Sequence, residues 1–416
     1  MLNLSSRPGF SPLKETEYRY YLTGRFFYTM SLRMVTTVIA YKLFQLTKSS
    51  FSIGLVGMSE FIPVFLLALY AGHRIDRTDK RTVLLNCKLS YAACVCALIL
   101  LTSSYFENRL NKGWLEFLFY LVIFFTGIIR AFAGPTSSSL VAQLVSKNVL
   151  HYAVNLSSSA FLGASILGHA SAGFFIAWFG VNTTFCIILI YVLIAAFMVR
   201  KIGRKPAVST SMDKKTWESV KEGLHFVFNN KILLGAISLD LFAVLFGGAI
   251  ALIPEFAERI LKVGPIGFGW LNASMDIGAV IMIILLSIFP IQKNQGRTLM
   301  FAVAGFGTCI IVFGLSNIYA ISFIALLIAG LLDGISVIIR GTILQLTTPD
   351  EMRGRVSSVN AIFINSSNEL GQFESGFTSR IMGTVPAVLF GGVMTVIVVI
   401  VMWFKAPPFV RWNTDS

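Results

Sequence analysis

The chain has 416 residues, of which 55% are hydrophobic and only 13% are charged, and its mean hydropathy is +0.75. A water-soluble protein of this length would expose far more charge and would divide into two or more ordinary domains. The net charge of +14 does not indicate a nucleic-acid-binding protein, because the basic residues concentrate in alternate connectors between apolar runs. The composition therefore predicts an all-α membrane protein that crosses the bilayer many times.

Long apolar runs recur along the whole chain. A helix needs about 20 mostly apolar residues to cross a hydrocarbon core roughly 30 Å thick, since each residue rises about 1.5 Å. Reading for such runs predicts twelve spans, of which the fifth and the eleventh are weakened by Ser, Asn and Gly. Their expected centres are Tyr28, Val64, Ala93, Val122, Ala164, Ile190, Val244, Ile281, Ile310, Ile328, Asn365 and Val396.

The basic residues set the expected topology. Most of the 34 Lys and Arg residues fall in the N-terminal segment and in alternate connectors, and cationic loops resist translocation. We therefore expect both termini on the cytoplasmic side of a bacterial inner membrane, where the basic loops face anionic lipid headgroups. Lipid is an expected partner, nucleic acid is not, and we expect a monomer.

The apolar pattern stops between Arg200 and Lys231, where the chain is basic and carries a Pro and a Ser/Thr cluster. The second part of this stretch has the spacing of an amphipathic helix on the cytoplasmic surface. Its apolar positions are Trp217, Val220, Leu224, and Val227 or Phe228. The stretch divides the chain into an N-terminal six-helix bundle (1–202), a cytoplasmic linker (203–230) and a C-terminal six-helix bundle (231–416).

Glycines recur at one offset in the two halves. Three glycines of GHASAGFFIAWFG (168–180) each have a counterpart 203 residues later in GQFESGFTSRIMG (371–383), and Gly127 meets Gly330 at the same offset. Four coincidences in matching spans indicate the duplication of a six-helix unit. Such parallel repeats are typical of transporters that hold their substrate between the halves, near the membrane midplane.

The connector after the second span, GHRIDRTDKR, is a dense group of charges. Its Gly72, the pair Asp76 and Arg77, and Arg81 resemble by position the loop signature of the major facilitator superfamily. The resemblance implies a conformational latch: Gly72 allows close helix approach, Asp76 faces the positive end of a helix, and Arg77 pairs with an acid. The alternative is a solvated turn whose charges only set the topology.

Further motifs extend the resemblance over nearly the whole chain. GIIRAFAGP, through Arg130, resembles the membrane-embedded arginine motif of the superfamily, whereas GHASAG departs from the antiporter signature of span five because His169 replaces a Pro. The segments 239–257, 263–273 and 351–376 are similar to the branch that contains the enterobactin exporter and related multidrug efflux proteins. This resemblance implies proton-driven export of a siderophore or an amphipathic drug.

Ionisable residues inside spans cost several kcal/mol and are candidates for substrate binding or proton coupling. The candidates are Arg33, Arg130, His169, Asp240, Asp276, Asp333, Glu369 and Glu374. Arg130 and Asp333 are 203 residues apart, so the repeat predicts equivalent depths in opposite halves, and we expect both to face one central region. Each candidate has the alternative of pairing locally to hold helices together, and we expect Arg340 to snorkel to the interface.

Three functional classes stay open from the sequence. The first is a proton-coupled exporter, the second an importer of a metabolite or metal chelate, and the third a non-transporting receptor or scramblase. We expect no catalytic residues, cofactor or metal site, because the chain has no phosphate-binding glycine loop followed by Lys, no metal-spaced His cluster and no nucleophile elbow.

Overall fold

The computed structural model describes residues 8–76, 78–205, 216–349 and 351–413, and these residues form helices and connectors without any strand. A helix satisfies its backbone polar groups internally, which is the requirement that lipid imposes on a spanning segment. The chain divides into two compact units, one of Met1–Lys42 with Ile62–Met212, the other of Leu43–Phe61 with Asp213–Ser416.

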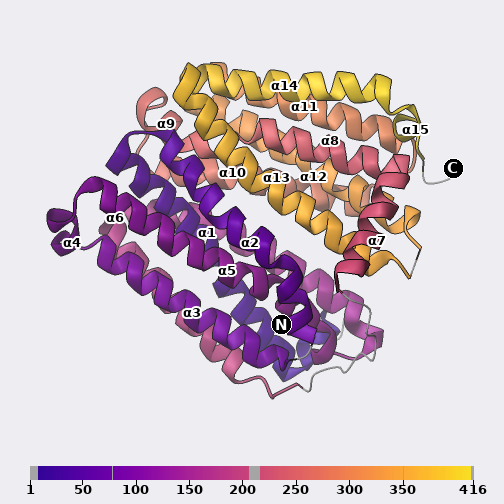
Figure 1. Ribbon diagram of the computed structural model, residues 1–416, viewed down its shortest axis with the longest axis horizontal. Coiled ribbons are helices and arrows are strands. Elements are labelled where there is room, and N and C mark those ends of the chain that lie inside the picture. Colours follow the sequence, from indigo (N-terminus) through magenta and orange to yellow (C-terminus); the bar gives the residue numbers. More distant parts are fainter. Residues whose placement is uncertain (1–7, 77, 206–215, 350, 414–416) are drawn as a thin grey trace, which may run out of the picture. The chain divides into compact units, whose positions relative to one another are not determined.

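The first unit is built from long helices that follow the 3-10 turn Pro8–Lys14. Within this unit α3 packs against both α5 and α6 (Figure 1). α1 crosses α6 closely, because a Cβ on Gly24 would lie 3.2 Å from the carbonyl oxygen of Ala195. The helices are α1 (Thr16–Thr47), α2 (Ser50–Asp76), α3 (Lys80–Leu101), α4 (Ser104–Arg109), α5 (Lys112–Leu144) and α6 (Leu150–Arg200), with a 3-10 turn at Lys147–Val149.

The second unit contains the remaining helices together with the end of α1 and the start of α2, as far as Phe61. Here α10 packs against α12, α11 against α12 and α14, and α8 against α13 and α14 (Figure 1). The helices are α7 (Thr216–Asn229), α8 (Lys231–Gly247), α9 (Ile253–Glu255), α10 (Pro265–Ile288), α11 (Gln295–Leu315), α12 (Tyr319–Thr347), α13 (Arg353–Met382), α14 (Thr384–Lys405) and α15 (Pro407–Val410). A 3-10 turn (Ala249–Leu252) precedes α9, and a π-helical turn (Phe256–Ile260) follows it.

The expected spans agree with these helices. Each of the twelve expected centres lies in a helix, and two of them share α6, which is broken at Gly180. By length and apolar composition alone, nine helical stretches of the described residues could cross a membrane, and α1 and α13 fall outside them. α13 carries the weak eleventh span, in which polar residues such as Ser367, Glu369 and Ser375 are buried and interrupt the apolar run.

The repeat extends to the backbone. Gly180 (φ 78°, ψ 171°) and Gly383 (φ 88°, ψ 166°) have nearly the same left-handed conformation, which a residue with a Cβ adopts only under strain. They are also the two glycines with positive φ among the residues that the structure describes. In each half this glycine separates the fifth from the sixth expected span, so both halves turn the same corner with the same residue.

The linker helix forms as the apolar spacing predicts. Val227 of α7 is fully buried and belongs to the core of the second unit, whereas Phe228 is 58% exposed, so Val227 is the inward position. Glu222 forms an ion pair with Arg355 of α13, which holds α7 along that helix. The side chains of Trp217 and Val220 lie outside the described residues.

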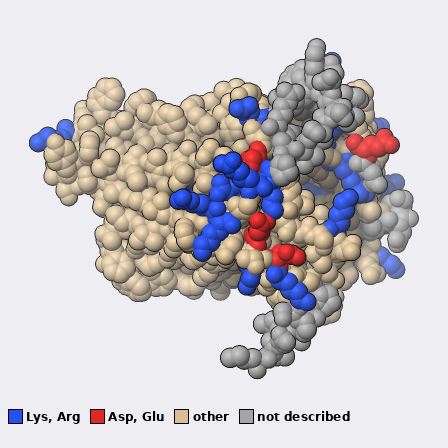
Figure 2. Space-filling model, turned by 90° about the horizontal axis from the view of Figure 1, so that it is seen from below, with Lys and Arg blue, Asp and Glu red and all other residues tan. Residues whose placement is uncertain are grey.

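The molecular surface is largely apolar. Leu66, Trp178 and Phe404 are 69%, 65% and 76% exposed, and such side chains on long helices suit contact with lipid tails. On the face drawn in Figure 2, Lys and Arg side chains gather in part of the surface and broad areas carry no charge. Together with the helix lengths, this describes a multi-pass membrane protein.

Candidate substrate and ion-coupling site

A buried ion pair links α8 and α12 of the second unit. The side chains of Asp240 and Arg340 are only 6% and 11% exposed, and the guanidinium Nη1 contacts the carboxylate Oδ2. The Arg340 Nε also donates to the carbonyl oxygen of Ser336 at 3.3 Å and to its hydroxyl at 3.2 Å. The expectation that Arg340 snorkels is therefore wrong, because a carboxylate on the neighbouring helix satisfies the guanidinium where it lies.

A small cavity adjoins this ion pair. Its volume of about 20 Å³ has room for a water molecule. Asp240, Asp333 and Ser336 supply its polar lining, and apolar residues of α8, α11 and α12 supply the rest. Asp333 interacts electrostatically with Arg340 and with Asp276 of α10. Three of the predicted acidic residues, Asp240, Asp333 and Asp276, therefore lie close enough to interact electrostatically at or beside this cavity.

The two candidates on α13 lie elsewhere in that unit. Glu369 is 8% exposed and accepts a hydrogen bond from Gln372 Nε2 at 3.4 Å. Its backbone is crossed by α2, since a Cβ on Gly57 would lie 2.8 Å from the Glu369 carbonyl oxygen. Glu374 accepts a hydrogen bond from the Thr378 hydroxyl at 2.8 Å. Neither carboxylate lines the cavity beside Asp240.

The first unit positions Arg33 and His169 on the contact between α1 and α6. A Cβ on Gly168 would lie 2.7 Å from the Cβ of Arg33, so the glycine brings the two helices together at that arginine. Four residues further along α1, the Thr37 hydroxyl lies 2.6 Å from His169 Nδ1 and donates to the Arg33 carbonyl oxygen at 3.0 Å. With the hydroxyl hydrogen directed at that carbonyl, His169 Nδ1 carries a hydrogen and donates to Thr37.

Arg130 lies on α5 of the first unit, partly exposed. Its repeat counterpart Asp333 lines the cavity of the second unit. The prediction that the two residues face one central region stays a prediction, because each is placed within its own unit.

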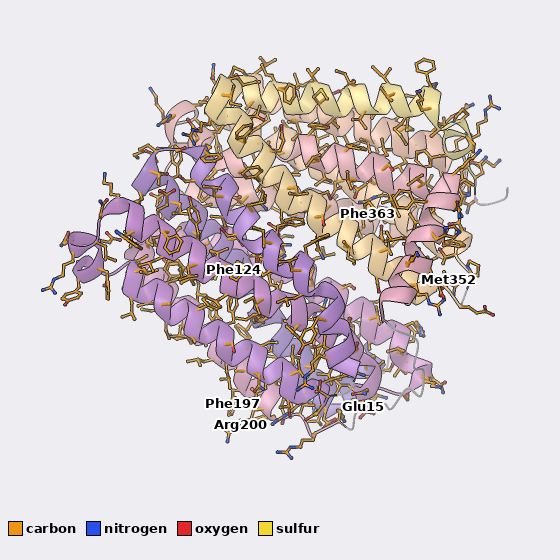
Figure 3. All side chains as sticks on the ribbon, in the orientation of Figure 1. Glu15, Phe124, Phe197, Arg200, Met352 and Phe363 are labelled. Atoms are coloured by element: carbon orange, nitrogen blue, oxygen red, sulfur yellow. The ribbon has the colours of Figure 1, made fainter. Side chains whose placement is uncertain are left out.

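The charged connector before α3 fastens parts of one unit together. Arg81 donates to the carbonyl oxygens of Ile202 (3.1 Å) and Arg200 (2.7 Å), at and just beyond the end of α6, and Figure 3 labels Arg200 there. These contacts lie within the first unit. The other expected latch residues, Gly72, Asp76 and Arg77, lie outside the residues whose side chains the structure describes.

Asp79, which the sequence analysis did not single out, organises the same connector. It caps α3 and accepts hydrogen bonds from the Arg81 amide (3.1 Å), the Thr82 hydroxyl (2.6 Å) and the Lys205 amide (3.1 Å). Burial by itself raises the pKa of a carboxyl, but these hydrogen bonds outweigh it and lower the pKa of Asp79 below its ordinary value. Because Asp79 reaches both α3 and the chain beyond α6, it anchors the start of the linker.

Two further cations of the first unit were not among the candidates chosen from the sequence. Lys88 of α3 is 2% exposed, with its Nζ 3.8 Å from the centroid of the Tyr28 ring. Arg25 of α1 has its Cζ 5.8 Å from the ring centroid of Phe161, and its Nη1 donates to the Tyr21 hydroxyl at 2.9 Å. Both lie within expected spans, so the criterion that selected Arg33 would have selected them too.

A second polar cluster closes the end of the second unit where α1 meets α2. Ser50 donates to the buried Glu255 at 2.5 Å, and Arg259 Nη1 contacts the other oxygen of Glu255 at 2.6 Å. Arg259 also donates to the carbonyl oxygen of Lys48 at 2.9 Å, and Lys48 pairs with Glu258. This cluster joins the α1–α2 connector to α9 and the π-helical turn, which sequence spacing cannot indicate.

Paired helical units with ionised groups inside them are the arrangement of membrane transporters of the major facilitator fold. The structure resembles the D-xylose–proton symporter with a TM-score of 0.75 and 13% identity, over 95% of this chain and 98% of that one. It resembles a bacterial homologue of the lysosomal transporter Spinster with a TM-score of 0.72 and 15% identity, over 98% and 99% of the two chains. These likenesses establish the fold.

The chain belongs to the major facilitator family described as transmembrane secretion effectors, whose family model matches residues 7–415. It is 23% identical over 355 residues to the multidrug efflux pump Tap of Mycolicibacterium fortuitum, covering 82% of this chain and 84% of that protein. It is 20% identical over 342 residues to the enterobactin exporter EntS of Shigella flexneri, covering 82% and 80%. The predicted fold and superfamily are thereby confirmed.

Proposed function

We propose that this protein exports an amphipathic small molecule, such as a siderophore or a drug, across the bacterial inner membrane by alternating access. The direction is supported by the efflux pump Tap and the exporter EntS, which match about four fifths of this chain. Cytoplasmic termini, two six-helix bundles joined by a cytoplasmic linker, and a monomeric state belong to the same proposal.

We further propose that protons drive export through the acidic residues beside the cavity of the second unit. Asp240 pairs with Arg340, Asp333 lines the same cavity, and the remaining cavity lining is apolar except for Ser336. With both carboxylates ionised, this group carries a net negative charge in a low-dielectric setting, and Asp276 adds to it; one bound proton relieves that cost. A proton that binds one conformation more tightly shifts the balance between inward-open and outward-open states.

Transport assays in membrane vesicles of known orientation test both the export direction and the proton coupling. Everted vesicles with an imposed pH gradient should accumulate a fluorescent amphipathic cation or anion, and an uncoupler should abolish the accumulation. Asp333→Asn should remove the dependence on the gradient while leaving slow equilibration of the probe. Glu222→Gln, which breaks an exposed ion pair of the same unit, is the matched control and should transport normally. Accumulation that ignores the gradient in the unmodified protein would reject proton coupling.

The same assay separates the alternative functions. Uptake into right-side-out vesicles, driven by the opposite gradient, would indicate an importer, and the D-xylose–proton symporter shows that this fold also serves a proton symporter. Probe flux that never depends on pH would favour a receptor or a scramblase. In the export proposal, Asp76→Asn should impair flux without reducing the amount of protein in the membrane, because the latch alternates between closed and open.

A further inference from the structure

Two arginines of the first unit share one aromatic ring. Arg25 and Arg33 lie eight residues apart on α1, which is about two helical turns, so they project from the same face. Their Cζ atoms lie 5.8 Å and 5.7 Å from the centroid of the Phe161 ring on α6. Both side chains and the ring are partly exposed. Both guanidiniums therefore lie within reach of the same aromatic ring.

The surroundings of this pair contain aromatic and neutral groups where an ion pair would be expected. Among the residues that the structure describes, no carboxylate lies within ion-pair distance of Arg25 or Arg33; their partners are Phe161 and the Tyr21 hydroxyl. An arginine inside a span normally pairs with an acid, since an uncompensated charge there costs several kcal/mol. Two like charges on one face repel each other as well, so the arrangement favours an anion.

The backbone at Arg33 and the guanidinium of Arg25 are positioned in advance. Gly168 brings the α6 backbone against Arg33 and Met30, with 2.8 Å from an added Cβ to the Met30 carbonyl oxygen. Arg25 is held by the Tyr21 hydroxyl, which itself lies 2.9 Å from the Ser137 hydroxyl of α5. Holding one donor and the backbone of the other before a ligand arrives lowers the entropy cost of binding.

We propose that Arg25, Arg33 and Phe161 form a binding site for an aromatic organic anion. Its carboxylate or phenolate oxygens would accept hydrogen bonds from the guanidiniums, while its ring would stack on the Phe161 side chain and the guanidinium planes. The inference deepens the proposed function, because it assigns the exported substrate to the anionic, ring-containing class. It assigns substrate recognition to the first unit and leaves proton coupling to the second.

Direct binding to purified protein tests the site without any transport. The probe is 2-naphthoate, whose fluorescence reports binding, and the protein is held in nanodiscs of zwitterionic phosphatidylcholine. Removing a charged hydrogen-bond donor weakens binding by about tenfold or more, so Arg25→Gln and Arg33→Gln should each have that effect. Phe161→Leu keeps an apolar side chain but loses the ring, and should weaken binding about threefold.

A matched control lies in the same unit. Arg109 stacks on Tyr105 with its Cζ 4.2 Å from the ring centroid, but it lies on the short helix α4, which pairs with α1 at Lys42, nine residues beyond Arg33. Arg109→Gln should leave naphthoate binding unchanged, and thermal unfolding of every variant shows that it is folded. Arg33→Lys keeps the charge and should retain more binding than Arg33→Gln.

Two comparison ligands and one lipid define the outcomes. The neutral 2-naphthamide and the non-aromatic cyclohexanecarboxylate should each bind at least about tenfold more weakly than 2-naphthoate. Naphthoate binding that is equal in folded Arg25→Gln, Arg33→Gln and unmodified protein would overturn the proposal. The absence of naphthoate binding to the unmodified protein would overturn it too. Naphthoate binding in phosphatidylcholine that anionic phosphatidylglycerol abolishes would identify a lipid-headgroup site instead. Since no gradient is applied, these results do not depend on whether protons drive export.

Discussion

The two units carry opposite charges in their membrane-spanning helices. The first presents Arg25, Arg33 and Lys88 against aromatic rings, whereas the second buries Asp240 against Arg340 and places Asp333 beside them. The glycine offset predicts a duplicated unit, and the two units differ in these side chains while each keeps a positive-φ glycine. In the proposed mechanism the two units divide the work: the cations of the first bind an anionic substrate, and the carboxylates of the second bind protons.

The largest expected loss of stability and of transport comes from the second unit, which contains Asp240 and Asp333. Asp240→Asn leaves the buried guanidinium of Arg340 without its acid, which typically costs about 3–5 kcal/mol in unfolding free energy. We expect proton-driven efflux to be lost and the thermal unfolding temperature in detergent to fall. The double variant Asp240→Asn with Arg340→Gln should recover part of the stability but not the coupling. A single variant as stable as the Glu222→Gln control, whose ion pair is exposed, would contradict this account.

In the first unit, removal of a buried charge should raise stability instead of lowering it. Lys88 is 2% exposed against the face of Tyr28, so Lys88→Met removes a buried polar group and keeps most of the apolar volume. We expect unfolding to become harder by about 1–3 kcal/mol, read as a higher unfolding temperature. Lys42→Met serves as the control. It makes the same substitution at a lysine that has an acidic partner, because Lys42 forms an ion pair with Glu107. Destabilisation by Lys88→Met would show that the amine has a partner that matters.

The shared backbone feature should show equal effects in both units. Gly180→Ala and Gly383→Ala force a Cβ into the left-handed region, which costs about 1–2 kcal/mol at each position. We expect two similar drops in unfolding temperature. Gly134→Ala and Gly341→Ala, where an added Cβ meets nothing within 4 Å, are helical controls and should be neutral or slightly stabilising. Unequal effects at the two corners would weaken the case for a conserved repeat.

The smallest effect concerns Asp79 and has a defined pH dependence. Its folded pKa is lowered, so its hydrogen bonds contribute stability above the unfolded value of about 3.9 and are lost as the pH falls through the folded value. We expect hydrogen-exchange protection of the Lys205 amide to be constant near neutral pH, to decline below about pH 4, and to fall a few-fold in Asp79→Asn. The Gly203 amide, which binds Glu17 at 2.8 Å, should keep its protection in that variant.

Local patterns in the sequence predict the helices and the repeat well. Apolar runs give the spans, the spacing of Leu224 and Val227 gives α7, and one glycine offset gives two equivalent corners. These features depend on residues close together in the chain or on a copied segment. They could therefore be read without knowing which helices touch.

The site depends on contacts that the sequence does not encode locally. Asp240 and Arg340 are recognisable as charges in spans, but their pairing requires α8 to lie against α12. Arg25 and Phe161 are far apart in the chain, and only the close crossing of α1 and α6 makes them neighbours. The grouping of the start of α2 with the second unit is likewise a result of tertiary packing, notably of Gly54 and Gly57 on α13.

The left-handed glycines bear on how the protein is made. Glycine permits this backbone bend without the strain that a Cβ would add, so each corner between the fifth and sixth expected spans can form as soon as those two spans are made. Each half carries its own positive-φ glycine, Gly180 in the first and Gly383 in the second. The second corner therefore does not depend on the first. We therefore expect each of the two corners to form without the other during membrane insertion.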